Sequence, residues 1–145
     1  MHRPGSKGIV MTPEEIDLVV KSFDALWPSR RQLAELFYGR FFELAPETRQ
    51  LFPDDMERQR LKLMDSLAAI VGSLDKRDMF QAIISQAGRQ HAQFGAKPAH
   101  FSAFGEALIW GLQQQLGPTF TPEVQQAWSA LYNDVQSRMI GAAQT

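Results

Sequence analysis

The chain has 145 residues, which is enough for one domain that buries roughly two-thirds of the surface its unfolded form exposes. It contains no cysteine, which excludes disulfides, thiolate metal sites, iron–sulfur clusters and cysteine nucleophiles. Its 15 basic and 16 acidic residues are spread along the sequence, which argues against nucleic acid or an anionic membrane as a partner. A small-molecule partner is therefore favoured.

The start of the chain carries no long apolar run. Gly8-Ile9-Val10-Met11 is too short for the apolar region of a signal peptide or for a membrane span. We therefore expect a cytoplasmic protein with a flexible N-terminal tail at 1–11, one domain at 12–141 and a C-terminal tail at 142–145.

Two helices are predicted in the first third of the chain. Thr12-Pro13-Glu14-Glu15 has the pattern of a capping box with proline at the first helical position, and the helix that follows should end near Trp27-Pro28. Ser29-Arg30-Arg31-Gln32 predicts a second capping box. Its helix carries an apolar and aromatic face too wide for a surface helix, made by Leu33, Leu36, Phe37, Tyr38, Phe41, Phe42 and Leu44.

A short helical piece is predicted from Ala45 to Phe52, where the turn cluster Pro53-Asp54-Asp55 stops it. A long helix should follow from about Met56, because apolar residues recur there at helical spacing. This stripe consists of Leu63, Leu67, Ile70, Val71 and Leu74.

Three more helices are predicted in the second half. After a solvated break at residues 75–78, an apolar stripe begins at Phe80 and ends at His91. The next helix follows Lys97-Pro98 and is closed by Gly117-Pro118, and Thr121-Pro122-Glu123 opens the last. About seven helices of unequal length, joined by short corners, favour an all-α fold of steeply crossing helices over a four-helix bundle.

His91 is the one polar member of its stripe, four residues after Ala87. A histidine there is either a core residue satisfied by a hydrogen bond or a metal ligand. As a ligand it would offer Nε2 to the metal while Nδ1–H donates to the Ala87 carbonyl, which fixes the ring's orientation and tautomer. The residues alone leave both interpretations open.

Three other residues stand out only in combination. Tyr38 lies in an aromatic cluster, Gln59 opens onto the apolar face of the long helix, and Phe52 precedes a chain turn. Taken singly, Tyr38 and Phe52 are typical of core packing and Gln59 of a fraying helix end. A haem-free helical interaction module would leave their combination with His91 unexplained.

The order of these residues resembles that of the bacterial single-domain globins and of the globin half of flavohaemoglobins. The resemblance covers about Thr12 to Ile140. It rests on Phe37-Tyr38, on Pro46 with Phe52 six residues later, on Gln59, on Lys62-Leu63-Met64, on Arg89-Gln90-His91-Ala92-Gln93-Phe94-Gly95, on Ala127-Trp128 and on Leu131-Tyr132.

The resemblance implies a globin fold packed around haem b. It makes His91 the proximal ligand of the iron, and it places Tyr38 and Gln59 on the distal side, where a gas binds. Because glutamine is a poor iron ligand, the sixth coordination position should be open or filled by water.

The same resemblance gives further residues a place at the cofactor. Phe52 matches a phenylalanine that packs against the porphyrin, and Leu63 matches a leucine that closes the gas pocket. Lys62 matches a basic position near a haem propionate, although a lysine on a solvated helix surface often needs no such explanation.

The implied function is reversible binding of O2 for storage, delivery or sensing, with NO and CO as further ligands. The alternative is a nitric oxide dioxygenase that is served by a separate reductase, since no FAD or NAD reductase domain follows the globin region. The chain departs from the flavohaemoglobin pattern at Phe101, where that family has a tyrosine, and in its last helix, which has no matching glutamate near its end. Weak peroxidase activity is the consequence we expect.

Overall fold

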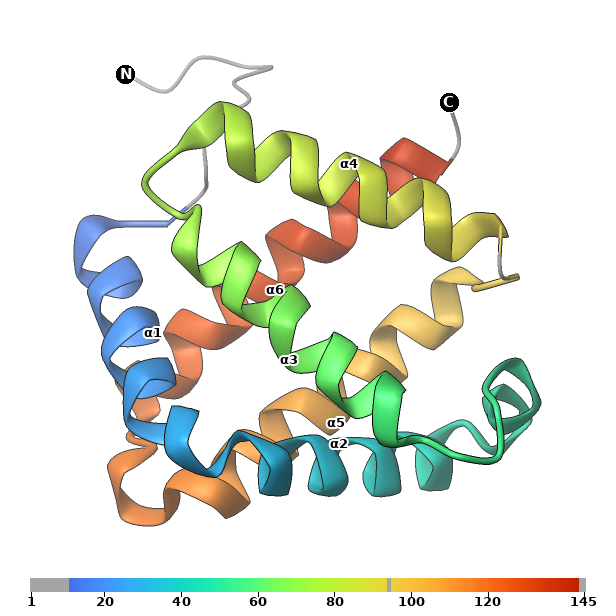
Figure 1. The fold of residues 1–145 in the computed structure, drawn as a ribbon. Coiled ribbons are helices and arrows are strands. Elements are labelled where there is room, and N and C mark those ends of the chain that lie inside the picture. Colours follow the sequence, from blue (N-terminus) through green and yellow to red (C-terminus); the bar gives the residue numbers. More distant parts are fainter. Residues whose placement is uncertain (1–10, 94, 144–145) are drawn as a thin grey trace.

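The computed structural model describes residues 11–93 and 95–143. This part of the chain folds into six α-helices and three short 3₁₀ helices, with no strand, which confirms the predicted all-α class (Figure 1). The elements in chain order are α1 (Pro13–Leu26), η1 (Trp27–Ser29), α2 (Arg30–Leu44), η2 (Pro46–Leu51), α3 (Glu57–Gly72), α4 (Arg77–Gln93), α5 (Pro98–Leu116), η3 (Gly117–Thr119) and α6 (Pro122–Ala143).

All seven predicted helical segments are present, but they are not all α-helices. The short piece after Ala45 is the 3₁₀ helix η2, so the count of α-helices is six rather than seven. Of the predicted N-terminal tail at 1–11, only Met11 lies within the described residues. At the other end, residues 142–143 belong to α6, and residues 144–145 of the predicted tail lie outside the described residues.

The first predicted capping box is confirmed. The Glu15 backbone N–H donates to Thr12 Oγ1 at 3.1 Å, and the Thr12 N–H donates to Glu15 Oε1 at 3.0 Å. Two donors at the start of α1 that have no partner within the helix are satisfied in this way.

The second predicted capping box, at Ser29, is wrong. Its hydroxyl donates to the Leu26 carbonyl at 3.1 Å and accepts a hydrogen bond from Gln115 Nε2 at 2.6 Å, so it does not cap α2. A hydrogen bond with Gln115 of α5 has replaced the expected hydrogen bond with the first turn of α2.

The helices pack in two principal pairs. In Figure 1, α5 crosses α2 and α6 crosses α4, and these two pairs make the most extensive helix contacts in the described chain. α3 follows η2 and leads into α4 through a short turn, and from that turn α3 and α4 diverge. The C-terminal end of α4 and the N-terminal end of α3 therefore lie at the same side of the molecule, away from the turn.

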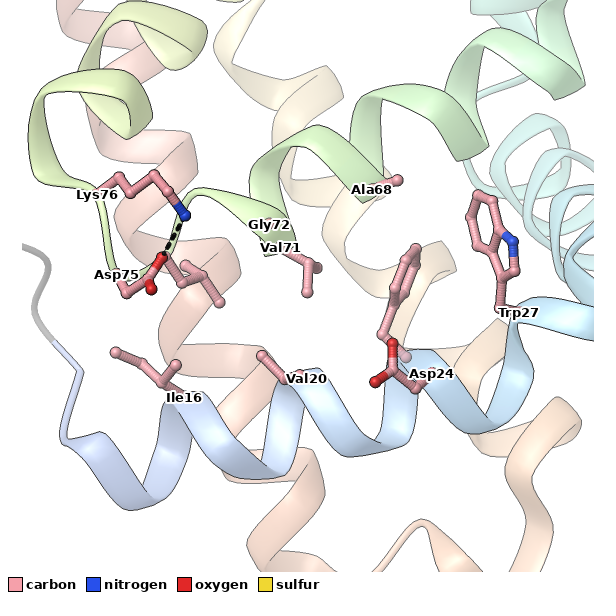
Figure 2. Close-up of a pocket in the computed structure, with 11 residues that line it drawn as sticks. Ile16, Val20, Asp24, Trp27, Ala68, Val71, Gly72, Asp75 and Lys76 are labelled. Atoms are coloured by element: carbon pink, nitrogen blue, oxygen red, sulfur yellow. Dashed lines mark hydrogen bonds and ion pairs between the residues drawn. The ribbon is translucent and has the colours of Figure 1, made fainter.

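A cavity of about 510 Å³ lies between α1 and α3 (Figure 2). Apolar residues such as Ile16, Val20 and Val71 line it, and the exposed Asp75–Lys76 ion pair lies at its edge. None of the residues predicted to form the functional site contributes to its lining.

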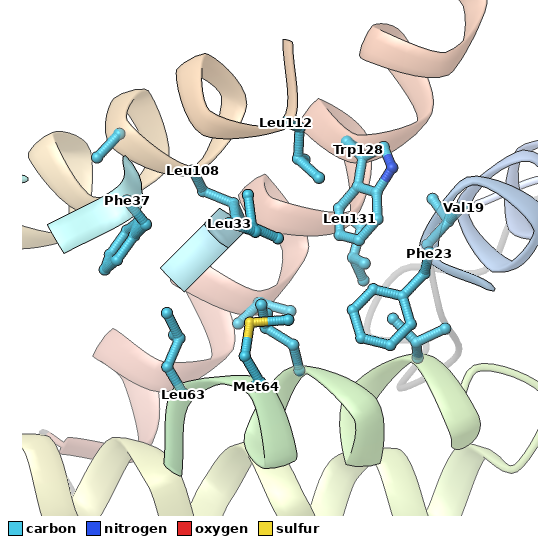
Figure 3. Packing of buried hydrophobic residues seen from close by; sticks show 14 of the residues in the cluster. Val19, Phe23, Leu33, Phe37, Leu63, Met64, Leu108, Leu112, Trp128 and Leu131 are labelled. Atoms are coloured by element: carbon cyan, nitrogen blue, oxygen red, sulfur yellow. The ribbon is translucent and has the colours of Figure 1, made fainter. Parts of the chain in front are cut away.

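The core runs between these helices and is continuous. Figure 3 shows Leu63 and Met64 of α3 directed toward Leu33 and Phe37 of α2, with Trp128 of α6 nearby. None of the helices in the described residues combines the length and the hydropathy that a membrane span requires.

Candidate functional site

Tyr38 and Gln59 are hydrogen-bonded to each other across two helices. Tyr38 lies on the buried face of α2 with 5% of its surface exposed, and Gln59 lies in the first turn of α3. The Gln59 amide Nε2 donates to the Tyr38 phenol oxygen at 3.2 Å. Because the phenol oxygen accepts this bond, the hydroxyl hydrogen can be donated to a third group.

Burial raises the pKa of the Tyr38 phenol above its ordinary value. The Gln59 hydrogen bond and the nearby charge of Arg60 act in the opposite direction, but burial is the larger cause. The phenol therefore stays protonated at neutral pH, and Tyr38 can serve there as a hydrogen-bond donor.

Aromatic rings hold the Tyr38 side chain in place. The Phe37 ring lies edge-on to it at 4.8 Å between centroids, and Phe52 does the same at 5.8 Å. Phe52 also packs against Phe42 at 5.5 Å. The half-buried Phe52, which directly follows η2, thus lies beside Tyr38, so these two predicted site residues are neighbours.

The other two predicted residues of α3 differ in exposure. Leu63, one turn after Gln59, is buried with 7% of its surface exposed and belongs to the core. Lys62 is exposed and faces solvent. In this position Lys62 can contact a polar group at the molecular surface. It does not face the Tyr38–Gln59 pair.

His91 lies in the last turn of α4 and is exposed. Its Nδ1 donates to the Ala87 carbonyl at 2.7 Å, which confirms the predicted hydrogen bond within the helix. With the proton on Nδ1, Nε2 carries a lone pair that can bind a metal. The Phe101 ring lies 6.1 Å from the imidazole and offers it no polar partner.

α4 approaches α6 closely just before His91. A Cβ atom on Gly88 would lie 2.5 Å from the Met139 carbonyl oxygen and 3.0 Å from its Cα, closer than atoms can pack. Because the clash is with backbone, no side-chain movement relieves it. Gly88 therefore allows α4 to take its place against α6, and it was not identified from the sequence, although a glycine inside a helical stripe is a known sign of close packing.

α5 connects the His91 side and the Tyr38 side. Phe101 in its first turn packs beside His91, and Phe104 packs against Phe37 at 4.4 Å, which in turn contacts Tyr38. Among the described residues, no direct contact joins His91 to Tyr38 or Gln59. The structure thus brings Tyr38, Gln59 and Phe52 together, and His91 belongs to a second group that shares α5 with them.

The metal-binding side chains of the described residues suit a metal that a cofactor already holds by most of its ligands. In the part of the chain that the structure describes, no group of three or more histidine, cysteine, aspartate or glutamate side chains could hold a metal ion. A single imidazole is enough for iron in a porphyrin, because the macrocycle supplies four nitrogens. His91, with Nε2 available and Nδ1 fixed by Ala87, fits that requirement.

Comparison with known proteins identifies the family. A globin family model matches residues 35–139, which is most of the chain, and the chain therefore belongs to the globin family. Globins are haem proteins, so membership implies a haem cofactor.

The relatives include both multidomain and single-domain proteins. The flavohemoprotein of Bacillus subtilis is 26% identical over 129 residues, which cover 87% of this chain and 32% of that protein. The chain thus spans about a third of the length of the flavohemoproteins it matches, and this match confirms the similarity to their globin domains. A neuroglobin of the fish Tetraodon nigroviridis is 28% identical over 144 residues, covering 89% of this chain and 90% of the neuroglobin.

Solved structures share the whole fold. A hexacoordinated haem protein from an anhydrobiotic tardigrade superposes with a TM-score of 0.86 over 94% of this chain and 97% of that chain, at 16% identity. An engineered carbene transferase from Rhodothermus marinus, whose parent is assigned as a nitric oxide dioxygenase, superposes with a TM-score of 0.83 at 29% identity, covering 93% and 94% of the two chains.

Proposed function

We propose that the chain binds haem b with His91 as the protein ligand of the iron, and reversibly binds O2 with Tyr38 and Gln59 as the residues that stabilise the bound gas. The haem would supply an iron atom with one coordination position open to a diatomic gas. The observation that carries the proposal is the partly buried hydrogen bond between Gln59 and Tyr38, because it leaves the phenol hydroxyl free to donate.

Tyr38 and Gln59 act as a relay of two donors. The Gln59 amide donates to the phenol oxygen, which polarises the hydroxyl and strengthens its own donation to a ligand. Toward a ligand that gains partial negative charge, the Tyr38 hydroxyl would donate a charge-assisted hydrogen bond. Phe52 and Leu63 keep this region apolar, and slow release of O2 is the expected result.

His91 and its surroundings favour reversible binding over peroxide cleavage. The Ala87 carbonyl orients the imidazole as a neutral ligand. The neighbouring Phe101 cannot accept a hydrogen bond, so it cannot increase the basicity of the ring as a carboxylate would. Weak peroxidase activity follows.

Nitric oxide dioxygenase activity is the alternative function. The similarity to flavohemoproteins and to the R. marinus protein favours this function. The parent of the R. marinus protein is assigned as a nitric oxide dioxygenase. In this case a separate reductase would return electrons after each turnover, and no side chain of this chain need act as a catalytic acid or base. NO and CO would bind at the same position as O2, with Lys62 close to a haem propionate.

Two measurements on the purified haem protein distinguish these functions. Stopped-flow kinetics give the O2 association and dissociation rates, and an NO electrode gives NO consumption with and without NADH and a generic reductase. An O2 carrier should release O2 slowly and consume about one NO for each haem, whether or not the reductase is present. A dioxygenase should consume NO continuously once the reductase is added, and a protein with no haem absorbance contradicts both functions.

A further inference from the structure

Arg60 contains a buried hydrogen-bond donor without a partner. It follows Gln59 on α3 and shares a helix face with the buried Met64 and Leu67, and its side chain is only 29% exposed. Among the described residues, no acceptor reaches its Nε, which is shielded from solvent. Buried donors in proteins nearly always have a partner, so one that lacks it indicates strain or a missing ligand or water.

The charge of Arg60 is also only partly compensated. The carboxylate of Glu57 is shared by two guanidinium groups, with Arg31 at 2.8 Å and Arg60 at 3.4 Å. Arg31 makes the shorter contact, and its side chain is 66% exposed. The three residues together carry one excess positive charge, and the more buried of the two cations is Arg60.

This positive charge acts on the Tyr38–Gln59 pair. Arg60 is adjacent to Gln59 in sequence, and its charge lowers the pKa of the Tyr38 phenol against the larger effect of burial. Its electric field therefore reaches the oxygen atom from which the site donates a hydrogen bond. A charge in a partly buried position is screened less by solvent and salt than one at the surface.

We propose that Arg60 determines ligand specificity at this site by favouring ligands that carry negative charge, such as azide or fluoride, over uncharged ligands such as carbon monoxide. The inference rests on the proposed haem function, because the anion would bind at the same iron position as the gas. An anion, or O2 with its partial negative charge, would gain from the positive charge of Arg60. Carbon monoxide carries almost no charge and gains little.

The test compares a charged and a neutral ligand on the same variants. Azide affinity is measured by absorbance titration of the ferric haem protein, and CO affinity on the ferrous form, for wild type, Arg60→Leu and Arg60→Gln. We expect azide to bind about tenfold more weakly in both variants and CO to bind within twofold of wild type. Arg60→Lys, which keeps the charge, should restore most of the azide affinity.

Arg31→Leu is the matched control. This variant also removes a positive charge that is paired with the Glu57 carboxylate, but the Arg31 side chain is the more exposed of the two. The azide and CO affinities should therefore both stay within twofold of wild type. An independent readout is ¹³C NMR of labelled tyrosine in the CO-bound protein, where only two tyrosines are present. Arg60→Leu should raise the phenol pKa of Tyr38 and leave Tyr132 unchanged.

Azide affinity within twofold of wild type in both neutral variants would overturn the inference. So would an equal loss of azide and CO affinity, since that indicates a general distortion of the site. In either case the proposed function stands if the wild type binds haem and O2. A wild-type protein that holds no haem contradicts the proposed function and this inference with it.

Discussion

The two sides of the candidate site are built by different means. Tyr38 and Gln59 come from α2 and α3, lie 21 residues apart in sequence, and are fixed by packing and by a side-chain hydrogen bond. His91 is exposed and is held by the backbone of its own helix, four residues back. The first side therefore depends on how two helices meet, whereas the second depends on local helix geometry and on where α6 places α4.

This difference predicts how each side responds to mutation. Removing the His91 imidazole should abolish the protein's bond to the iron completely, while the stability of the fold should change little. Changing either the buried Tyr38 or the half-buried Gln59 should alter gas binding by degrees, because the other residue and the aromatic surroundings remain.

The largest effect is expected for His91→Gly, which should give a folded protein with little haem. The imidazole contributes no buried contact that the fold requires, and glycine near a helix end costs about 1 kcal/mol or less. Haem content is measured by the ratio of Soret to protein absorbance, and folding by far-ultraviolet circular dichroism. Added imidazole should restore haem binding, whereas full haem content and an unchanged ferrous spectrum in the variant would show that His91 is not the ligand.

Gly88→Ala should have the next largest effect. The added methyl group overlaps the Met139 backbone, so α4 must move, and overpacking of this kind costs about 1–3 kcal/mol of unfolding free energy. Gly39→Ala is the matched control, since nothing lies within 4 Å of that position on α2, and it should stabilise the protein by about 0.5–1 kcal/mol. Urea denaturation measures both, and equal effects of the two substitutions would refute the close approach of α4 and α6.

The smallest effect is expected for Thr12→Ala, which removes the cap of α1. Loss of the capping box should cost about 1 kcal/mol of unfolding free energy. Because α1 carries none of the predicted site residues, the O2 rates should not change. A changed O2 dissociation rate in this variant would mean that the two sides of the site are not as independent of α1 as the structure indicates.

Sequence patterns predicted the helices well where the signal was local. Thr12 and Glu15 lie three residues apart, so their reciprocal hydrogen bonds could be recognised from the pattern alone. The same reasoning failed at Ser29, because its partner Gln115 is 86 residues away and competes successfully for the hydroxyl. Short 3₁₀ segments such as η2 also cannot be told from α-helices by apolar spacing.

The candidate site shows the same limit. The resemblance to globins singled out Tyr38, Gln59, Phe52 and His91, and the structure places the first three side by side. It could not single out Gly88, whose importance depends on the backbone of α6. Arg60 was also missed, because a sequence does not show that an arginine in a charged helix turn has a buried, unpartnered nitrogen.

The most direct test of the account is the O2 dissociation rate of the ferrous protein after Tyr38→Phe, Gln59→Leu and both changes together. Loss of one charge-assisted hydrogen bond of about 1.5–3 kcal/mol predicts roughly tenfold to hundredfold faster release for Tyr38→Phe. Gln59→Leu should have a smaller effect, since the structure directs its amide to the phenol oxygen and its side chain must order three torsions. The two effects should not add, because Gln59 acts on the ligand through the Tyr38 hydroxyl. A Tyr38→Phe rate within twofold of wild type would contradict the account and leave Tyr38 as a residue of the core.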